Sequence, residues 1–372
     1  MWSHVKISAG RNEGATVNQE LSRRLQFFLE RGVSGRSTQS APGLAIGSLR
    51  GPVREDNQDR AAVAYMVSKS GAAALVGVVC DGMGGMAEGG VAATLATSEF
   101  LAALVSNLDN LSPPVISVAV RNANDAVYRQ LGGNGGTTLT ALVALGTGHS
   151  WAVHVGDSRL YSVDDTDGLV LLTRDDTIEG VVKGSQADED SLDSRLLQFI
   201  GIGDSIDPHI FPVEGQVRKR FLLTSDGAHS LGRKILEGIF RNTRGAVDAV
   251  RRLTYIADAT NVADNATAVA LSMADFSPVP QFHSGSTLMV WSPSGALEIW
   301  LQGGGADSTD SPIKRVASGH PAPKREKSSK PKPRAGSKRN VREKVKDFKE
   351  KPKSQRPQLS IKFGGDGSSS DD

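Results

Sequence analysis

The chain has 372 residues, a formal net charge of +2, 38% hydrophobic and 5% aromatic residues, 41 glycines and one cysteine. Such a composition is typical of a β-rich or mixed fold with many turns and argues against a helical bundle. The single cysteine excludes an intramolecular disulfide and favours a reducing compartment. Because there is neither a run of 18 apolar residues nor an apolar signal core, we expect a cytoplasmic protein with no membrane association.

The charge is distributed unevenly. From Gly304 onward there are 18 Lys and Arg against 9 Asp and Glu, which leaves 25 basic and 32 acidic residues in 1–303. Residues 304–357 are rich in Lys, Pro, Ser and Gly, and such a segment cannot bury enough apolar surface to offset its ordering entropy. We therefore predict a basic disordered tail over 304–372, which contains one short β-prone stretch, QLSIKF (358–363).

The predicted elements begin with a short amphipathic helix in VNQELSRRLQFFLER (17–31), whose leucines and Phe28 share one helical face. GRSTQSAP (35–42) reads as a linker, so 1–42 forms an N-terminal helix and linker. From Gly43 to Ala274 short β-patterned runs alternate with two longer helical ones. The strand candidates are GLAIGSLR, AAALVGVVC, TTLTALVAL, SWAVHVGDSRLYSV, LVLLT, KRFLLTSD and ATAVALSM, and the helical candidates are GGVAATLATSEFLAALVSNL and PPVISVAVRNANDAVYRQL.

This order of elements predicts an α+β fold, a four-layer αββα sandwich in which two central antiparallel β-sheets are flanked by helices. The main domain is expected over 43–275. Two β-prone runs around Ser-Pro-Ser-Gly in TLMVWSPSGALEIWLQ (287–302) predict an extra hairpin, placed in a 276–303 extension.

Four aspartates lie next to strand candidates: Asp81, Asp157, Asp226 and Asp264. A carboxylate at a strand end is held by a rigid element at a sheet edge, where several can converge. Mg²⁺ and Mn²⁺ prefer oxygen ligands of this kind. Gly82, which follows Asp81, has no side chain, so its backbone can approach an ion closely.

Each of these features alone has a simpler interpretation. An Asp-Gly after a strand is usually a turn, and the glycine-rich loop after Asp81 lacks the Lys-Ser/Thr of a P-loop and the spacing of a dinucleotide fingerprint. What favours a site is the number of such features and their order along the chain.

Eight segments in sequence order resemble the motifs of the metal-dependent Ser/Thr protein phosphatases of type 2C (the PPM family), and their forms are most similar to the bacterial branch. The resemblance spans about 43–274. The segments are GPVREDNQD (51–59), DGMGGMAEGG (81–90), GGTTLTALVAL (135–145), VGDSRLY (155–161), LTRDDT (172–177), RLLQFIGIGD (195–204), LLTSDG (222–227) and DNAT (264–267).

The resemblance implies a two-metal site at one edge of the sandwich, with Mn²⁺ or Mg²⁺ and possible room for a third ion. Asp81 would bridge the two ions, and the Gly82 carbonyl would ligate one of them. Asp226 and Asp264 would complete the coordination of the ion next to them, and Asp157 matches the ligand of a weaker third metal position. Two such ions can lower the pKa of a bridging water to about 7 and stabilise charge on the attacking and leaving oxygens.

Two further residues receive roles from the resemblance. Asp59 would hold a water bound to the metal, and Arg54 would grip the substrate phosphate, for which a planar bidentate donor is better suited than Lys. Three residues depart from common forms of the motifs: Gln58, Met83 and Met86. Met83 stands where animal relatives have a histidine proposed as general acid, so protonation of the leaving group is expected to fall to a metal-bound water.

Three other reactive side chains lie near the motifs. Cys80 is inside an apolar run and lacks the C-x₅-R cradle, so we assign it to the core. His154 is assigned to packing, and His229 is a weaker candidate for the cleft. Between LTRDDT and RLLQFIG the chain is several residues shorter than its relatives, which bears on substrate docking and third-metal binding at the flap.

The sequence therefore predicts hydrolysis of phosphoserine and phosphothreonine on proteins, by a hydroxide bridging two metal ions, in opposition to a bacterial Ser/Thr kinase. The substrate would be that kinase or its target, and the protein is expected to be a monomer. The alternative is a pseudophosphatase, a scaffold that binds a partner through the hairpin and tail. The tail is either a solvated linker or a docking segment for an acidic protein. Binding of nucleic acid by the tail is not expected, because aromatic residues are almost absent from the tail.

Overall fold

The computed structural model describes residues 2–8, 13–83, 88–164, 168–178, 180, 195–204, 206–214, 220–276 and 286–302. The chain divides into two compact units, Met1–Ser308 and Thr309–Asp372, and all of the described residues belong to the first. The predicted disordered tail, QLSIKF, Met86 and nearly all of the shortened stretch 178–194 lie outside the described residues.

The first sheet has eight strands in the order β1-β14-β13-β4-β5-β6-β7-β10. Neighbours are antiparallel except β1 and β14, which are parallel. The predicted hairpin is confirmed as β13 and β14, and because β13 pairs with β4 it widens this sheet. The bounds are β1 (Trp2–Ser8), β4 (Arg60–Val67), β5 (Ala73–Cys80), β6 (Leu139–Leu145), β7 (Ser150–Val155), β10 (His209–Pro212), β13 (Ser286–Ser292) and β14 (Gly295–Gln302).

The second sheet has six antiparallel strands in the order β2-β3-β12-β11-β8-β9. The stretch 35–42, predicted as a linker, was assigned wrongly, because residues 36–41 form β2 at the edge of this sheet. An edge strand is half exposed and can be polar throughout, so its sequence lacks hydrophobic alternation. The bounds are β2 (Arg36–Ala41), β3 (Leu44–Leu49), β8 (Arg159–Asp164), β9 (Gly168–Leu171), β11 (Arg220–Thr224) and β12 (Ala266–Ser272).

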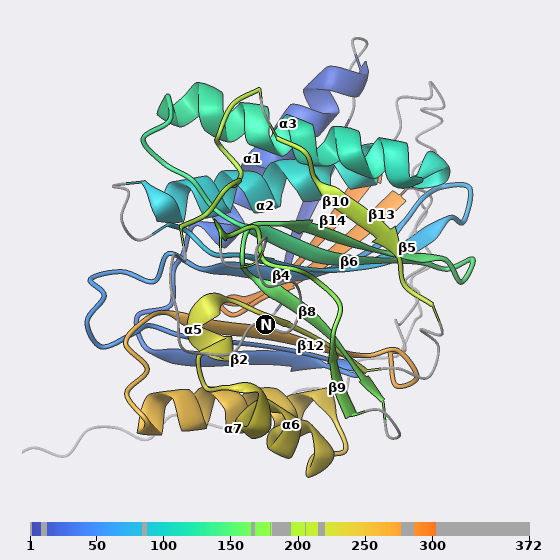
Figure 1. Ribbon diagram of the computed structural model, residues 1–372. Coiled ribbons are helices and arrows are strands. Elements are labelled where there is room, and N and C mark those ends of the chain that lie inside the picture. The colour runs from blue at the N-terminus through green and yellow to red at the C-terminus, as the bar shows by residue number, and fades with distance from the viewer. Residues whose placement is uncertain are drawn as a thin grey trace, which may run out of the picture. The chain divides into compact units, whose positions relative to one another are not determined.

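Helices cover the outer face of each sheet (Figure 1). Helices α1 (Glu13–Leu29), α2 (Gly89–Ser106) and α3 (Pro113–Leu131), with the 3₁₀ turn η1 (Leu108–Asn110), lie on the first sheet. Helices α5 (Asp226–His229), α6 (Arg233–Arg241) and α7 (Ala246–Ala259) lie on the second. The four-layer α+β sandwich predicted from the sequence is therefore confirmed.

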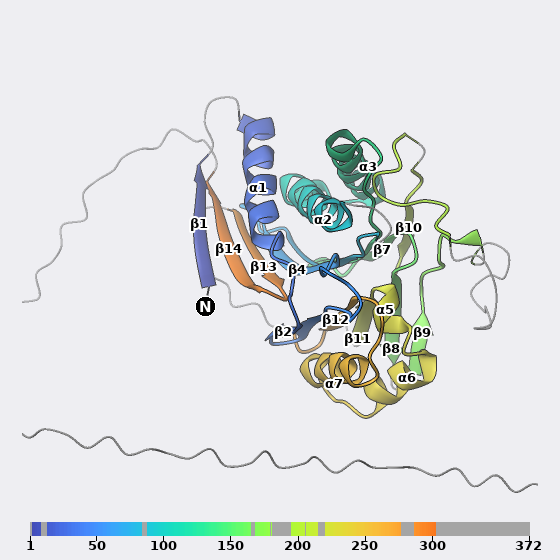
Figure 2. The ribbon, with the colours of Figure 1, turned by 90° about the vertical axis from the view of Figure 1, so that its left-hand side faces the viewer.

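Helix α2 is the one described helix that is long and apolar enough to cross a membrane, with a mean hydropathy of 1.4 over its 18 residues. However, 67% of those residues are buried inside the fold, among them Phe100 and Leu101. Its apolarity is that of a helix packed between α1, α3 and the first sheet, as Figure 2 shows.

The core between the two sheets holds the strand ends in place. Its buried side chains come from both sheets and include Ile46, Val79, Leu142, Phe221 and Val269. Burial of apolar surface stabilises a fold by about 25 cal/mol per Å². This layer therefore holds the two sheets firmly against each other. Loops at the strand ends are thus anchored on both sides, which is what a multi-carboxylate site requires.

Candidate active site

The strand registers bring four predicted aspartates to one edge of the sandwich. Asp59 and Asp81 flank the paired strands β4 and β5 at the same end. Asp226 and Asp264 flank β11 and β12 in the same way. The two sheets meet here, because the backbone amide of Asp226 donates to Oδ2 of Asp81 at 3.3 Å.

Asp81 is held by its backbone. Its amide donates to Thr138 Oγ1 at 2.9 Å, and its carbonyl accepts bonds from the Thr138 amide at 2.9 Å and from Thr137 Oγ1 at 2.8 Å. With every backbone polar group satisfied, the residue is fixed at the end of β5. Of its side-chain oxygens, Oδ2 accepts the Asp226 amide.

Asp59 is buried and is held by one residue that follows a strand of the opposite sheet and by one residue of its own loop. Its Oδ2 accepts a hydrogen bond from Ser225 Oγ at 2.9 Å, and its amide donates to Asn57 Oδ1 at 3.0 Å. Ser225 Oγ in turn accepts from the amide of Thr267 at 2.9 Å. Ser225 thus connects Asp59 to the strand that follows Asp264.

Two carboxylate oxygens at this edge, Oδ1 of Asp59 and Oδ1 of Asp226, are buried with no hydrogen-bond partner among the described residues. Burial, with repulsion from nearby carboxylates, raises the pKa of Asp59 to about 6 and that of Asp157 to about 7. The same causes raise the pKa of Asp226 and raise that of Asp81 well above its usual value. Buried like charges of this kind mark functional sites.

Arg54 lies beside this cluster and pairs with Asp264 through Nη2 and Oδ2. The pair is accessible, with exposed fractions of 35% and 32% for the two side chains. The hydrogen bond to Asp264 raises the pKa of Arg54. The loop is braced by Arg50, whose Nη1 donates to the Arg54 carbonyl at 2.6 Å. A positively charged guanidinium group therefore lies at the solvent-accessible side of an acidic site.

Gly82 occupies a position that no side chain could share. An added Cβ would lie 2.5 Å from the carbonyl oxygen of Gly89 and 2.7 Å from that of Gln58, and both contacts are with backbone. The loop before Arg60 and the first turn of α2 therefore close directly onto the backbone of Gly82.

Asp157 lies where the chain crosses from one sheet to the other. The predicted strand SWAVHVGDSRLYSV is in fact β7 and β8, separated at Gly156, which has a φ of +104°. The Gly156 amide donates to Asp176 Oδ2 at 2.9 Å, and this bond fixes the turn. Asp157 is close enough to the cluster that its charge contributes to the raised pKa of Asp81.

Cys80 and Met83 flank the Asp81–Gly82 pair. Cys80 is buried, and burial raises the pKa of its thiol to about 12, which confirms its assignment to the core. Met83 donates its amide to the Gly136 carbonyl at 3.0 Å, and its Sδ packs against the same glycine. Met83 therefore packs against this loop and offers no proton.

His154 and His229 also have structural surroundings. His154 is buried in β7, with Thr140 Oγ1 3.0 Å from Nδ1 and the Arg174 carbonyl 2.9 Å from Nε2, as expected for a packing residue. His229 is partly buried, and its Nδ1 lies 3.2 Å from Thr224 Oγ1. Burial lowers the pKa of both rings, and that of His229 is well below its usual value.

Several residues that shape the site were not identified from the sequence. Ser225, Thr138 and Asn265 all lie inside the recognised motifs, yet their side chains bond groups distant in the chain: the Asp59 carboxylate, the Asp81 amide and the Gly51 amide, respectively. Asn265 Oδ1, for example, accepts from the Gly51 amide at 3.1 Å. These residues could have been found from the sequence, because each lies close to an aspartate or glycine of a motif and has a side chain that can cap a loop.

The donor set at this edge suits a hard divalent cation. It consists of carboxylates, two of which have buried unpartnered oxygens, together with a backbone cradle at Gly82 that a Cβ would fill. Within the described part of the chain, no three His, Cys, Asp or Glu side chains are drawn together closely enough to form a metal group as they stand. One oxygen of Asp264 is turned to Arg54, and one of Asp81 accepts the Asp226 amide.

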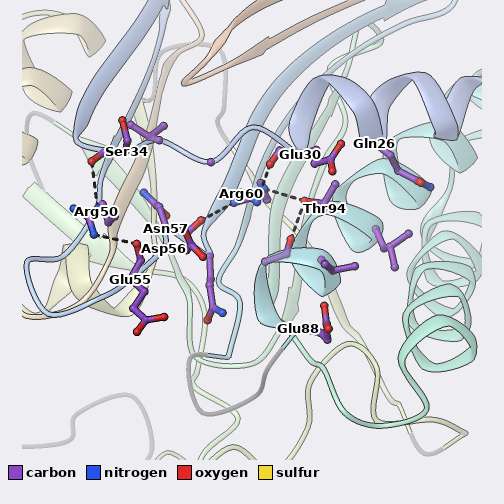
Figure 3. A pocket seen from close by; sticks show the side chains of 16 residues that line it. Gln26, Glu30, Ser34, Arg50, Glu55, Asp56, Asn57, Arg60, Glu88 and Thr94 are labelled. Atoms are coloured by element: carbon purple, nitrogen blue, oxygen red, sulfur yellow. Dashed lines mark hydrogen bonds between the residues drawn. The ribbon is translucent and has the colours of Figure 1, made fainter.

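A cavity of about 850 Å³ lies behind the Arg54 loop, between the end of α1 and the start of α2, and none of the predicted site residues line it (Figure 3). Its two arginines are engaged with backbone carbonyls. Arg60 donates to the carbonyls of Asn57 and Asp59 at 2.8 Å, and Arg50 holds the Arg54 loop. The residues around this cavity therefore support the Arg54 loop, and the cavity lies apart from the carboxylate cluster.

Comparisons with known proteins agree with this geometry. A profile of the family described as "Protein phosphatase 2C" matches residues 53–270. Similar solved structures include the PPM Ser-Thr phosphatase MsPP of Mycobacterium smegmatis in complex with cacodylate, at 28% identity, covering 64% of this chain and 99% of that one with a TM-score of 0.52. No curated protein sequence matches the chain.

Two further structures are of PstP. Its catalytic domain in complex with two manganese ions is 28% identical, with 64% of this chain and 98% of that one covered and a TM-score of 0.50. The PstP/Ppp phosphatase of Mycobacterium tuberculosis is 27% identical, with 64% and 99% covered and a TM-score of 0.51. The chain therefore belongs to the protein phosphatase 2C family and is a protein serine/threonine phosphatase.

Proposed function

We propose that the chain hydrolyses phosphoserine and phosphothreonine in proteins at the edge formed by Asp81, Asp226 and Asp264, which with the Gly82 carbonyl would hold two Mn²⁺ or Mg²⁺ ions. The observation that carries this proposal is the pair of buried, unpartnered oxygens of Asp59 and Asp226 beside an accessible Arg54. When bound, the two ions would activate a water for direct attack and neutralise charge on the phosphoryl group. The related PstP structure with two manganese ions supports this cofactor.

Arg54 is placed to orient the substrate. Its fork can form two parallel bonds to phosphate oxygens, which gives geometric specificity as well as attraction. In the structure it bonds to Asp264, and the negative charges of Asp226 and Asp81 also raise its pKa. A phosphate bound to Arg54 would therefore lie directly over the carboxylate cluster.

Asp59 is the candidate for holding a water during the reaction. Its Oδ2 is used by Ser225, whereas its buried Oδ1 has no partner in the described structure. Burial raises the pKa of this carboxyl to about 6. Asp157 is proposed as the ligand of a weaker third position, on the strength of its charge coupling to Asp81.

The substrate must be made by a kinase, because only phosphoryl transfer to a hydroxyl gives the ester that this site would cleave. We therefore propose that the protein opposes a bacterial Ser/Thr kinase in the cytoplasm, and acts on that kinase or its target as a monomer. The bacterial sources of two of the related structures support the first part of this proposal.

The test is phosphate release from p-nitrophenyl phosphate and from a phosphothreonine peptide as Mn²⁺ is titrated into chelator-treated protein. Asp226→Asn is expected to lower turnover by at least about 100-fold, since a ligand matters more than an outer partner. Asp248→Asn, an exposed position on α7, is the matched control and should leave turnover unchanged. A folded protein without Mn²⁺-dependent release would instead support the scaffold alternative.

A further inference from the structure

A groove of about 620 Å³ lies between the edge strand β2 and helix α7, outside the candidate active site. The two elements lie side by side at the rim of the second sheet (Figures 1 and 2). Its apolar surface includes Ile256 and Tyr255, and 63% of the Tyr255 residue is exposed. The remaining lining residues are Arg36, Thr38, Arg251, Arg252 and Thr254.

The groove carries positive charge that the protein does not neutralise. Arg251 and Arg252 are exposed on α7, and their guanidinium groups have no hydrogen bond or ion pair within the described residues. Arg36 lies 5.3 Å from the centre of the Tyr255 ring and 3.4 Å from an oxygen of Asp258. Among the described residues, Asp258 is the one carboxylate in an ion pair with a groove arginine, and Asp248 lies one helical turn before Arg251 and Arg252.

Strand β2 is an edge strand, and the β13–β14 turn reaches it through one side-chain bond, from Ser37 Oγ to the Pro293 carbonyl at 2.7 Å. It ends the order of the second sheet, and β3 is its one strand neighbour among the described residues. Arg36 and Thr38 are two residues apart and both line the groove, so alternate side chains of β2 face α7. An extended segment added beside β2 would likewise direct alternate side chains into the groove.

Both walls of the groove are connected to the Arg54 loop by short links. On the β2 side, the Arg50 amide donates to the Gly35 carbonyl at 3.1 Å, and Arg50 Nη1 donates to the Arg54 carbonyl. On the other side α7 ends at Ala259, five residues before Asp264, the partner of Arg54. The groove is thus close to the site that would receive a phosphate.

The distance between the two places can be bounded from the chain. Arg36 is paired with Leu49, and Arg54 lies five residues beyond Leu49. Five residues span at most about 18 Å and a strand pair adds about 5.5 Å, so Arg36 and Arg54 are within about 24 Å of each other. A segment of about seven extended residues covers that distance.

We propose that this groove is a docking site for an extended, anionic segment of the phosphoprotein substrate, whose carboxylate or second phosphate group is bound by Arg36, Arg251 and Arg252 within about seven residues of the residue being dephosphorylated. The proposal rests on the proposed function and adds a substrate class to it. Guanidinium groups bind both anions by paired hydrogen bonds, and complementary charge lowers KM without entering the chemical step.

The test compares phosphothreonine peptides that differ in one tag. The tag is three glutamates, three glutamines or one phosphoserine, placed three or seven residues from the phosphothreonine on either side. For at least one of these placements, wild-type protein should show a KM about tenfold lower for a glutamate or phosphoserine tag than for glutamine, with equal kcat. The ratio of the two anionic tags distinguishes carboxylate from phosphate recognition.

The variant Arg251→Ala/Arg252→Ala should lose this preference and keep its kcat on the glutamine peptide and on p-nitrophenyl phosphate. Alanine is the best helix former, so α7 should stay folded. Lys234→Ala/Arg244→Ala, which removes the same charge from exposed positions outside the groove, is the matched control and should keep the preference.

Binding of an unphosphorylated glutamate peptide, followed by fluorescence anisotropy, tests the groove even if no substrate is turned over. A wild-type protein without any tag preference would overturn the proposal, and so would an equal loss in the control variant. Tighter binding of a short single-stranded DNA than of either peptide would overturn it in favour of nucleic acid. Absence of hydrolysis together with intact peptide binding would refute the proposed function and leave the groove assigned to anionic peptides.

Discussion

The carboxylate edge and the arginine groove both hold like charges close together, but one is buried and the other is exposed. At the edge, Asp59 and Asp226 each have an oxygen with no partner among the described residues, and burial raises the pKa of both carboxyls. In the groove, Arg251 and Arg252 point into solvent.

The difference shows what each region can do. A buried charge without a partner destabilises the fold and is strongly responsive to any cation or proton that reaches it. An exposed charge costs little and is screened by salt, so it alters association more than chemistry. We expect the edge to control turnover and stability, and the groove to control the choice of substrate.

The largest effect is expected from removing one carboxylate at the edge. Asp81→Asn should lower Mn²⁺-dependent turnover by at least about 100-fold, because the proposed bridging ligand is lost. In chelator the same variant should have a higher Tm than wild type, since a partly buried charge is removed from its neighbours Asp59, Asp157 and Asp226. Phosphate release and thermal unfolding measure the two effects. A lower Tm in chelator would contradict the assigned repulsion.

The close packing of backbone around Gly82 should matter nearly as much for turnover and stability as the charge of the carboxylates does. Gly82→Ala would place a Cβ 2.5 Å from the Gly89 carbonyl oxygen, and overpacking of this kind costs typically about 1–3 kcal/mol. Denaturant unfolding should therefore show a lower free energy of unfolding together with reduced turnover. Gly238→Ala is the matched control, because nothing lies near a Cβ there, and it should be at least as stable as wild type.

The pH dependence of stability should also come from the edge. The folded pKa values of Asp59, about 6, and Asp157, about 7, both lie above the unfolded value of 3.8. The folded protein therefore binds protons more tightly than the unfolded chain does, and this stabilisation is complete below about pH 4 and lost as pH rises to about 7.

In chelator, Tm should accordingly fall between pH 5 and pH 7.5, as measured by differential scanning calorimetry. Asp157→Asn should show a smaller fall than wild type over the same interval. Arg251→Ala/Arg252→Ala should match wild type, because arginine does not titrate there. An identical pH profile for wild type and Asp157→Asn would refute the raised pKa of Asp157.

The two regions differ as well in how far the sequence predicted them. Asp81, Gly82 and Asp226 were identified because a carboxylate or glycine at a strand end is a local signal. The pairings of the site residues were not predicted, since the Arg54–Asp264 pair and the Ser225–Asp59 bond join residues 210 and 166 positions apart. Such contacts depend on the register of the strands.

The groove was not predicted at all, because both of its walls were missed. Strand β2, RSTQSA, is polar apart from Ala41 and was taken for a linker, and α7, AVDAVRRLTYIADA, was not recognised as a helix. Strand β4, RAAVAYMV, was missed because alanine is a weak signal for a strand. Its position was nevertheless implied by the motif that ends at Asp59.

The smallest effect is expected from removing a carboxylate at the groove, in direct contrast to Asp81→Asn. Asp258→Asn breaks an exposed ion pair with Arg36, and such pairs contribute about 0–1 kcal/mol, so the free energy of unfolding should change little. Turnover of p-nitrophenyl phosphate should be unaffected. Binding of the glutamate-tagged peptide should instead become about two- to threefold tighter, because the groove gains net positive charge and Arg36 is released to its ligand. Weaker binding would mean that Asp258 serves mainly to orient Arg36, and the groove would then depend on geometry more than on its net charge.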